Sequence, residues 1–416
     1  MDRIILHCDL NNFYASVECL HHPEYRNQPL AVGGDVEKRH GIILAKNPLA
    51  KAYNIQTGEA LWQARAKCPH LLIVKPNFSL YLRFSRMVKD IYADYTDQIE
   101  SFGIDEAWLD VSHTLHLFHC SPGQLADRIR QRIKDEVGIT ASVGVSFNKI
   151  FAKLGSDLKK PDATTLITRQ NMESLVFPLP ISDLLYVGRA TTRKLAELGI
   201  HTIGDCAQYD VAILKRKLGK WGDYIWRFAN GMDTSTVLVR HHEPPVKSIG
   251  NSTTCPKDLK TMEDVRIVAY VLAESVAARL KEAHLLCTTI SIGVRDIHLQ
   301  GFTRQRKVEE PTQLSDTIAQ VALDLFEENV DFSNALRSIG IKASDLVLDS
   351  HIQQLSVFSD AEDREKALQL EKTIEAIRER YGFQAVQRCL MLNDTVLSGF
   401  NPKQEHVIFP EAYFKG

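Results

Sequence analysis

Three acidic side chains that end apolar segments are the residues of this chain best suited to chemistry. Asp9 stops the apolar run 4–8, and Asp105 and Glu106 stand side by side much later in the sequence. Carboxylates that converge repel one another, so such a cluster is a poor way to stabilise a fold. It is a good site for hard divalent cations, which take oxygen ligands. Two such cations about 4 Å apart can clamp the attacking and leaving oxygens of an in-line phosphoryl displacement.

The local sequence places all three acids at strand ends. An apolar run bounded by a polar break is typical of a buried strand, which predicts a strand over 4–10. The second segment predicts a hairpin, with strands over 98–102 and 106–111 around a turn at 103–104. Taken singly, an Asp that ends a strand is most often a turn or cap residue, and an Asp-Glu pair in a turn is most often solvated surface. Only the joint pattern favours a site.

The bulk composition indicates an ordinary globular protein without a membrane partner. The 416 residues leave room for about two to four domains. No apolar stretch approaches the ~20 residues that cross a bilayer, and no leader opens the chain. The eight cysteines are scattered without a C-x-x-C pair, which argues against zinc and disulfides and for a reducing, cytoplasmic compartment. A formal net charge of −2 is mild evidence against extended DNA contact, so local charge must carry any such binding.

Alternating strands and helices surround the acids in the first part of the chain. The patterns predict helices over 13–20, 77–98 and 125–137, a strand over 140–146, and a helix from 148 that ends before Pro161. Strand–helix alternation with mixed pairing predicts a ferredoxin-like sheet. On the last helix, Lys149 and Lys153 lie four residues apart, away from the apolar face. A solvated lysine face is the ordinary interpretation of that pattern.

The second part of the chain predicts a small helical unit and then a second sheet. Residues 171–236 have the shape of a helix-hairpin-helix unit, and the polar, proline-bearing stretch 241–247 is typical of a linker. The expected elements beyond it are strands over 247–252, near 290–294, 302–308 and 337–343, a helix capped at Thr261, and a helix from Leu314. Together they predict a sheet with two helices on one face.

Two motifs carry a resemblance to a known family. Asp-Leu-Asn-Asn-Phe-Tyr at 9–14 and Ile-Asp-Glu-Ala-Trp-Leu-Asp at 104–110 resemble the Y-family (DinB/UmuC-like) translesion DNA polymerases. The Ala-Lys-Asn and Ala-Lys sequences of segment 45–51 resemble a UmuC-like branch of Gram-positive bacteria. The resemblance runs from about Arg3 to Leu348. It implies an α+β, multidomain right-hand polymerase with a ferredoxin-like palm, small fingers, a helical thumb and an α+β little finger. The expected boundaries are palm 1–30 and 77–170, fingers 31–76, thumb 171–236, linker 237–246, little finger 247–349 and a C-terminal tail 350–416.

The resemblance also implies a catalytic site. Asp9, Asp105 and Glu106 would be catalytic and, with the Leu10 carbonyl, would hold two Mg²⁺ ions, with Mn²⁺ able to substitute. Tyr14 would be the steric gate against a ribose 2′-hydroxyl, although most helical tyrosines are core residues. The further nucleotide-binding residues implied are Phe13, Lys51 and Lys160.

The fingers depart from the family pattern. Many relatives have a hydroxyl, a Tyr and an Arg where this chain has Ala45, Pro48 and Lys51. Lys binds phosphate as a point charge and lacks the bidentate fork of Arg. Lys46 and Lys51 therefore restore the charge of the triphosphate clamp but not its geometry.

DNA contacts are expected from two places. In the helix-hairpin-helix, Gly188-Arg189-Ala190 replaces the usual Gly-x-Gly, and we expect Gly188 and Arg189 to contact a phosphate through backbone N–H groups and charge. Because alanine tolerates positive φ poorly, Ala190 predicts a changed loop. The basic residues expected on DNA-facing strands are Lys247, Arg295, Arg304, Arg306 and Lys307. Such contacts are phosphate-directed and salt-sensitive.

The tail carries a short motif that resembles the clamp-binding peptide of bacterial polymerases. Gln354 would anchor it by hydrogen bonds, while Leu355 and Phe358 enter an apolar groove. A five-residue pattern often arises by chance, and its position directly after the little finger is what favours the motif. A charged helix with an apolar stripe follows over 361–381, and the sequence assigns it no role.

The sequence therefore predicts a template-directed, low-fidelity translesion DNA polymerase. Its expected partners are primer–template DNA, deoxynucleoside triphosphates and a sliding clamp, and it is expected to act as a monomer. The main alternative is a catalytically weak, polymerase-like DNA-binding scaffold recruited to the clamp. A helix-hairpin-helix glycosylase would need a base-flipping pocket with a catalytic Lys or Asp, and a ferredoxin-like cyclase would leave residues 171–350 unexplained.

Overall fold

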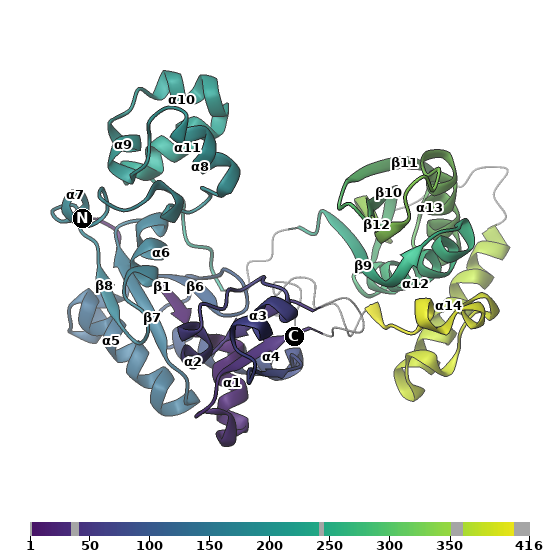
Figure 1. Cartoon of the computed structure of the whole chain (residues 1–416), viewed down its shortest axis with the longest axis horizontal. Helices are drawn as coiled ribbons and strands as arrows, with labels where there is room; N and C mark the ends of the chain where they lie inside the picture. The colour runs from purple at the N-terminus through teal and green to yellow at the C-terminus, as the bar shows by residue number, and fades with distance from the viewer. Residues whose placement is uncertain (1, 35–40, 241–244, 351–360, 403–416) are drawn as a thin grey trace. The chain divides into compact units, whose positions relative to one another are not determined.

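The computed structural model describes residues 2–34, 41–240, 245–350 and 361–402. The described chain forms two compact units (Figure 1). Residues 2–34 and 42–240 make unit 1, and residues 245–350 and 361–402 make unit 2. In the described residues, no helix is both long enough and apolar enough to cross a membrane.

A five-stranded sheet forms the centre of unit 1. Its strand order is β5-β6-β1-β7-β8, from β5 (Ile99–Ser101), β6 (Glu106–Asp110), β1 (Ile5–Leu10), β7 (Ala141–Ser146) and β8 (Thr164–Leu166). The central strand β1 runs antiparallel to both neighbours, β6 and β7. The predicted first strand and acidic hairpin are therefore confirmed, and Gly103 supplies the positive φ of +87° in the hairpin turn.

Helices cover both faces of this sheet, as the two-residue period of β1 requires. Leu6, Cys8 and Leu10 face a core built with α4 (Phe78–Ala93) and α5 (Pro122–Arg132). Ile5 faces the other way, toward Trp108 and Ala152 of α6 (Lys149–Leu158). His7 and Asp9 share that second face with Ile5, so they lie under α6. Helix α1 (Phe13–His21) follows β1.

A smaller sheet in unit 1 belongs to residues 30–74. It has the order β3-β2-β4, from β3 (Ile43–Lys46), β2 (Leu30–Gly33) and β4 (Leu72–Val74), with α2 (Pro48–Ala52) and α3 (Leu61–Lys67) packed on it. Its small core includes Ala31, Ile43, Ile55 and Leu61. Strand β4 was not predicted from the sequence, because a strand of three residues is too short to show a period.

The rest of unit 1 is a helical group (Figure 1), whose core is shared with Phe151 and Leu154 of α6. It consists of α7 (Met172–Leu175), α8 (Arg189–Ala196), α9 (Ile203–Gln208), α10 (Val211–Leu218) and α11 (Lys220–Ala229). Ala190 lies inside α8 and needs no positive φ, so the reason for expecting a changed loop does not apply. Just before this helix, Tyr186 has a positive φ of +71°.

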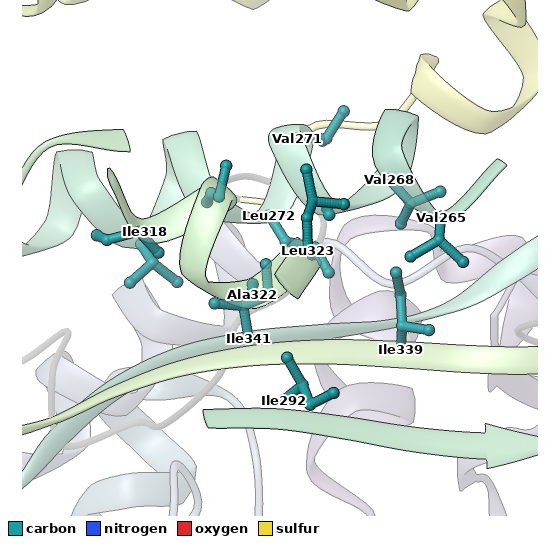
Figure 2. Close-up of a cluster of buried hydrophobic side chains, with 14 of the residues drawn as sticks. Val265, Val268, Val271, Leu272, Ile292, Ile318, Ala322, Leu323, Ile339 and Ile341 are labelled. Atoms are coloured by element: carbon teal, nitrogen blue, oxygen red, sulfur yellow. The ribbon is translucent and has the colours of Figure 1, made fainter. Parts of the chain in front are cut away.

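Unit 2 is a four-stranded antiparallel sheet with two helices on one face, as predicted. The order is β11-β10-β12-β9, from β11 (Gly301–Thr312), β10 (Leu285–Asp296), β12 (Leu336–Leu348) and β9 (Ser248–Leu259). The helices are α12 (Met262–Glu282), which Thr261 caps, and α13 (Ser315–Asn329). In Figure 2, side chains of α12 and α13 such as Val268 and Leu323 lie over Ile339 and Ile341 of β12.

The C-terminal segment packs on this same unit. The predicted helix is confirmed as α14 (Ala361–Tyr381), and it is followed by η6 (Cys389–Asn393) and α15 (Thr395–Ser398). Met391 and Leu397 are fully buried in the core of unit 2. Lys281 of α12 pairs with Glu371 at 2.5 Å and with Glu375 at 2.7 Å, which ties α14 to α12.

One glycine sets the distance between α6 and the sheet. Gly144 of β7 is the cross-strand partner of His7. A Cβ atom at this position would lie 1.9 Å from the Ala152 carbonyl oxygen and 2.5 Å from the Ser156 nitrogen. The backbone of α6 therefore rests directly on the sheet, which brings the side chains of α6 close to His7 and Asp9.

We predict that Gly144→Ala destabilises unit 1 by about 2–4 kcal/mol, because the added Cβ meets backbone atoms that cannot move aside. Urea unfolding of the full chain measures the loss. Gly123→Ala is the matched control, since a Cβ at Gly123 in α5 meets nothing within 4 Å. Equal stability of the two variants would contradict the close approach of α6.

Candidate active site

The structure brings the three predicted acids together at one end of the central strands. Asp9 on β1 and Glu106 on β6 are direct cross-strand partners. The Leu10 N–H donates a hydrogen bond of 3.1 Å to the carbonyl oxygen of Asp105, which fixes the hairpin turn against the end of β1. Like charges placed directly opposite each other on neighbouring strands are destabilising. The arrangement therefore needs compensating positive charge.

Two lysines of the α6 region supply that charge. Lys153 Nζ lies 3.3 Å from Asp9 Oδ2 and 3.0 Å from Glu106 Oε1. Lys160 Nζ lies 2.7 Å from Asp9 Oδ2. Asp157 pairs with both lysines, at 3.1 Å and 2.8 Å. The cluster thus alternates carboxylates and ammonium groups.

The solvated lysine face expected on this helix is wrong. Lys149 is buried, pairs with Glu100 at 2.6 Å, and has its Nζ 4.5 Å from the centre of the Trp108 ring. Lys153 keeps only 13% of its side chain exposed. Both lysines face inward because the acids of β1, β5 and β6 lie beneath α6, and sequence spacing alone does not show this.

Burial and neighbouring carboxylates shift the pKa values of the acids in this cluster. Burial, Glu106 and Asp9 raise the pKa of Asp105 to about 7. The pKa of Asp9 is also raised, by burial and by Glu106, although two lysines touch this carboxylate. Burial alone would lower the pKa of Lys153, but Glu106, Asp157 and Asp9 raise it. Both lysines therefore stay charged.

The donor chemistry of the cluster suits a hard cation. The three carboxylates and the neighbouring Leu10 backbone offer only oxygen ligands, as Mg²⁺ and Ca²⁺ prefer. Glu106 Oε2 is buried without a hydrogen-bond partner. Within the described ranges, no group of three or more His, Cys, Asp or Glu side chains forms a ready metal cage. Here the Lys153 ammonium group bridges Asp9 and Glu106, in the place of a cation.

Helix α1 begins with two aromatic residues, Phe13 and Tyr14, shortly after Asp9. Tyr14 stacks on Tyr81 with ring centres 4.4 Å apart and planes 12° apart. Burial and the negative charge of Asp105 raise the pKa of Tyr14 to about 12. Phe13 is only 2% exposed and belongs to the core behind the sheet, whereas Tyr14 is partly buried and packs against that core.

Comparisons with known proteins agree with this geometry. Residues 8–157 match the model of the impB/mucB/samB family, residues 246–357 its C-terminal domain, and residues 182–233 the thumb domain of DNA polymerase-iota. A DNA polymerase IV of Acetivibrio thermocellus is 50% identical over 398 residues, which cover 96% of this chain and 100% of the relative. DNA polymerase IV 1 of Bacillus subtilis is 34% identical over 394 residues, which cover 93% of this chain and 92% of the relative.

The chain belongs to this family, the Y-family of DNA polymerases. The solved structure of a Y-family chimera, Dbh-Dpo4(243-245)-Dbh, shows the same fold with a TM-score of 0.74 at 24% identity, over 83% of this chain and 99% of that one. The predicted family, the right-hand α+β fold and the translesion polymerase activity are confirmed at this level. The individual site residues and the domain boundaries stay predictions.

The predicted fingers segment has two lysines, Lys46 and Lys51, whose charges act on each other. Burial and the positive charge of Lys51 lower the pKa of Lys46. Lys51 is exposed on α2, which Pro48 begins and the Asn47 side chain caps. Pro48 thus has a helix-starting role here, since its missing N–H is not needed at the first helical position. A shared anion would relieve the repulsion between the lysines.

The predicted DNA-binding residues lie at two places in the polymerase. Gly188 is the N-cap of α8 and Arg189 is the first residue of that helix, exposed and without an ion pair in the described chain. In unit 2, Arg304 and Arg306 are cross-strand partners of the core residues Ile292 and Ile290, so they lie on the helix side of the sheet. Arg304 donates a hydrogen bond to the Asn329 side chain, and Arg306 pairs with Glu328. Glu328 and Asn329 are the last two residues of α13.

The open face of the same sheet carries other basic residues. Side chains along a strand point alternately to the two faces of the sheet. Arg295 and Lys307 therefore lie on the face opposite to that of the core residues Ile290 and Ile292. Lys342 of β12 is the partner of Ser291 and lies on the same face. All three are exposed, as is Lys247 just before β9, and none has an ion pair among the residues that the structure describes. Lys342 was not singled out from the sequence, although it alternates with the core residues Ile341 and Ala343.

The predicted clamp-binding residues Gln354, Leu355 and Phe358 lie outside the described residues. Two inner residues of the site were missed from the sequence: Lys153, assigned to the solvent, and His7. The signal for His7 was present, because His7 is two residues before Asp9 on a strand and therefore shares its face.

We predict that Asp105→Asn raises the melting temperature of the metal-free protein at pH 8. The pKa of Asp105 rises from 3.8 to about 7 on folding, so this group stabilises the fold below about pH 4 and that stability is lost as pH rises to about 7. The gain from Asn should shrink toward pH 5. Thermal unfolding in EDTA at both pH values measures it, with the exposed Asp135→Asn as the control. A gain that is the same at both pH values would contradict the raised pKa.

Proposed function

We propose that Asp9, Asp105, Glu106 and the Leu10 carbonyl hold two Mg²⁺ ions, with Mn²⁺ able to substitute, and that this site joins a deoxynucleoside triphosphate to a primer 3′-hydroxyl. The observation that carries the proposal is the cluster of carboxylates neutralised by the lysine ammonium groups. When bound, the cations would stabilise the charge on the attacking and leaving oxygens of the in-line displacement. The chain itself contributes position and electrostatics.

Each proposed cation would have its own set of ligands, and Asp9 and Asp105 would belong to both sets. Asp9, Asp105 and Leu10 would hold the triphosphate side, while Asp9, Asp105 and Glu106 would hold the primer side. Lys160 now contacts Asp9, and its long side chain would turn to the β- and γ-phosphates of the nucleotide. Lys51, with Lys46 beside it, would add charge from the fingers. A lysine binds such a phosphate as a point charge, so we expect this clamp to be adaptable in geometry.

Tyr14 would select the deoxyribose. Its stack on Tyr81 fixes the ring, and a fixed ring can exclude a 2′-hydroxyl by contact. Phe13 would act on the nucleotide through the backbone of α1 and the packing of Tyr14, whose ring centre is 5.7 Å from its own.

The other parts would hold primer–template DNA. The palm at 1–30 and 77–170, the fingers at 31–76, the thumb at 171–236 and the little finger at 247–349 are the boundaries that we propose. Gly188 and Arg189 would contact a phosphate at the start of α8. On the little finger, four basic residues of the open face would contact DNA phosphates: Lys247, Arg295, Lys307 and Lys342. Arg304 and Arg306 would contact phosphates from the edge strand β11.

We further propose that the polymerase works as a monomer in the cytoplasm and binds a sliding clamp. DNA as the substrate supports the location, and the Gln354, Leu355 and Phe358 motif supports the clamp. This motif lies between two segments of unit 2, ending at residue 350 and beginning at 361.

We predict that the wild type extends a primer on undamaged and abasic templates with Mg²⁺, and that Asp105→Ala lowers the rate by at least about a thousandfold, because the site loses a ligand to both cations. Single-turnover primer extension measures this rate, and primer–template affinity serves as the control for folding. Wild type that binds primer–template yet adds no nucleotide, even with a sliding clamp, would overturn the proposal in favour of the scaffold alternative and would direct attention to Ala45, Pro48 and Lys51.

We predict that Arg295→Ala and Lys307→Ala each weaken primer–template binding and lower the salt slope of log K by about 1, because each removes one phosphate contact. The effect should be the same for different DNA sequences. Fluorescence anisotropy over a range of KCl concentrations measures it, with Lys366→Ala on α14 as a charge-matched control. An unchanged slope would show that the open face does not touch DNA. A larger loss for Arg306→Ala would place the contact at the edge near α13.

A further inference from the structure

A buried asparagine connects the end of β1 to the segment that follows α6. Asn11 lies two residues after Asp9 and is only 4% exposed. Its side-chain oxygen Oδ1 accepts the backbone N–H of Asp162 at 2.8 Å. Lys160, two residues before Asp162, lies 2.7 Å from Asp9. The Asn11 side chain therefore ties the backbone near Lys160 to the strand that carries Asp9.

The partners of the Asn11 amide fix its orientation. The backbone N–H of Asp162 can only donate, so it must face the side-chain oxygen of Asn11. The Thr140 hydroxyl donates to the same oxygen at 3.1 Å, and the Asn11 Nδ2 group donates to the Ser142 hydroxyl at 2.9 Å. In the flipped orientation two N–H groups would face each other in a buried place. Because an amide does not titrate, this contact is the same at any working pH.

Asp162 is the fixed point of the segment. Its φ of +51° lies in the left-handed region, where a residue other than glycine needs support from its surroundings. Arg130 of α5 donates to its carbonyl oxygen at 2.6 Å and to its Oδ1 atom at 2.8 Å. Lys134 pairs with its Oδ2 atom at 3.0 Å. Asn11 and Arg130 therefore hold the N–H and the carbonyl group of the same residue.

The side chain of Lys160 starts from this anchored backbone. Pro161, whose ring fixes φ, is the single residue between Lys160 and Asp162. The Lys160 ammonium group now contacts Asp9 at 2.7 Å and Asp157 at 2.8 Å. A turn toward a phosphate would break these two contacts, whereas the backbone contact of Asn11 would remain. Asn11 would then set the place from which the long side chain extends.

We propose that Asn11 is a positioning residue of the polymerase, whose Oδ1 atom holds the Asp162 N–H and so fixes the backbone from which Lys160 reaches the β- and γ-phosphates of the nucleotide. The inference rests on the proposed function, because it assumes that Lys160 contacts those phosphates. Asn11 itself would touch neither the nucleotide nor a cation. A displacement of about 1 Å at a group that positions a substrate can cost about a hundredfold in rate, so such an anchor has a measurable effect.

The experiment compares Asn11→Ala with the wild type in the full chain. The matching deoxynucleoside triphosphate is titrated with Mg²⁺ into each protein bound to a dideoxy-terminated primer–template, and single-turnover extension of an ordinary primer gives the maximal rate. We expect Asn11→Ala to weaken nucleotide binding about three- to tenfold, because the contact of a charged group is weakened and not removed. The maximal rate should stay within about threefold, since the lost contact serves binding of the nucleotide.

A second background separates positioning from a general loss of packing. Lys160→Met removes the ammonium group and should weaken nucleotide binding about tenfold or more. In the Lys160→Met background, Asn11→Ala should change the nucleotide affinity by less than about twofold, because the group that Asn11 positions is gone. A role of Asn11 in packing, or in the placement of the Leu10 carbonyl, would instead give the same loss in both backgrounds.

Thr140→Val is the matched control. It removes the other hydrogen bond to Asn11 Oδ1 and leaves the contact with Asp162. Its nucleotide affinity should lie within about twofold of the wild type, and primer–template affinity should be unchanged in all variants. If Asn11→Ala does not fold, Asn11→Leu takes its place, because leucine branches at the same atom and has no acceptor. The same loss of nucleotide affinity is expected for it.

The outcomes distinguish this inference from the proposed function. A folded Asn11→Ala or Asn11→Leu with wild-type nucleotide affinity overturns the inference, and so does an equal loss in the wild-type and Lys160→Met backgrounds. If Lys160→Met weakens nucleotide binding and the Asn11 variants do not, the inference alone fails. If Lys160→Met binds the nucleotide as the wild type does, the proposed role of Lys160 fails and the inference falls with it.

Discussion

The mutual repulsion of Asp9, Asp105 and Glu106 is the constraint on which unit 1 depends. Two of these acids are cross-strand partners and the third lies in the adjoining turn. A fold can tolerate such a cluster only if positive charge stands close to it. Helix α6 and the residues just after it provide that charge through Lys153 and Lys160. The same repulsion would favour the divalent cations that we propose for this site, so the instability and the proposed chemistry would have one cause.

The position of α6 connects packing to the site. Gly144 lets the helix backbone rest on the sheet, and this contact sets how far Lys153 and Ser156 reach over β1. His7 and Ser156 are buried under α6 and contact each other at 2.8 Å, and His7 lies 3.4 Å from the inner oxygen of Glu106. Lys153 and Lys160 contact the same acid cluster from α6 and the residue that follows it by two.

The two faces of the unit 2 sheet have different tasks. One face packs α12 and α13 and also holds the edge residues Arg304 and Arg306 near the end of α13. The other face presents Arg295, Lys307 and Lys342 to the solvent. A net charge of −2 for the whole chain is therefore compatible with a local group of exposed basic side chains on this face. Residues 361–402 add to the core of this unit and contribute buried Met391 and Leu397.

The sequence by itself determined the strands that end in acids, the helices around them, the helix-bearing second sheet and the family, because periodicity and the two motifs are local properties. It could not decide which lysines face solvent: Lys149 and Lys153 have the spacing of a surface pair and lie over acids that come from distant strands. It likewise gave no face to Arg304 and Arg306, since one residue of register moves a side chain to the other side of a sheet. The neighbours of His7, Ser156 and Glu106, are likewise brought to it only by tertiary packing. Contacts between residues far apart in the chain are fixed by how elements pack, and the local pattern of each element carries no record of its neighbour.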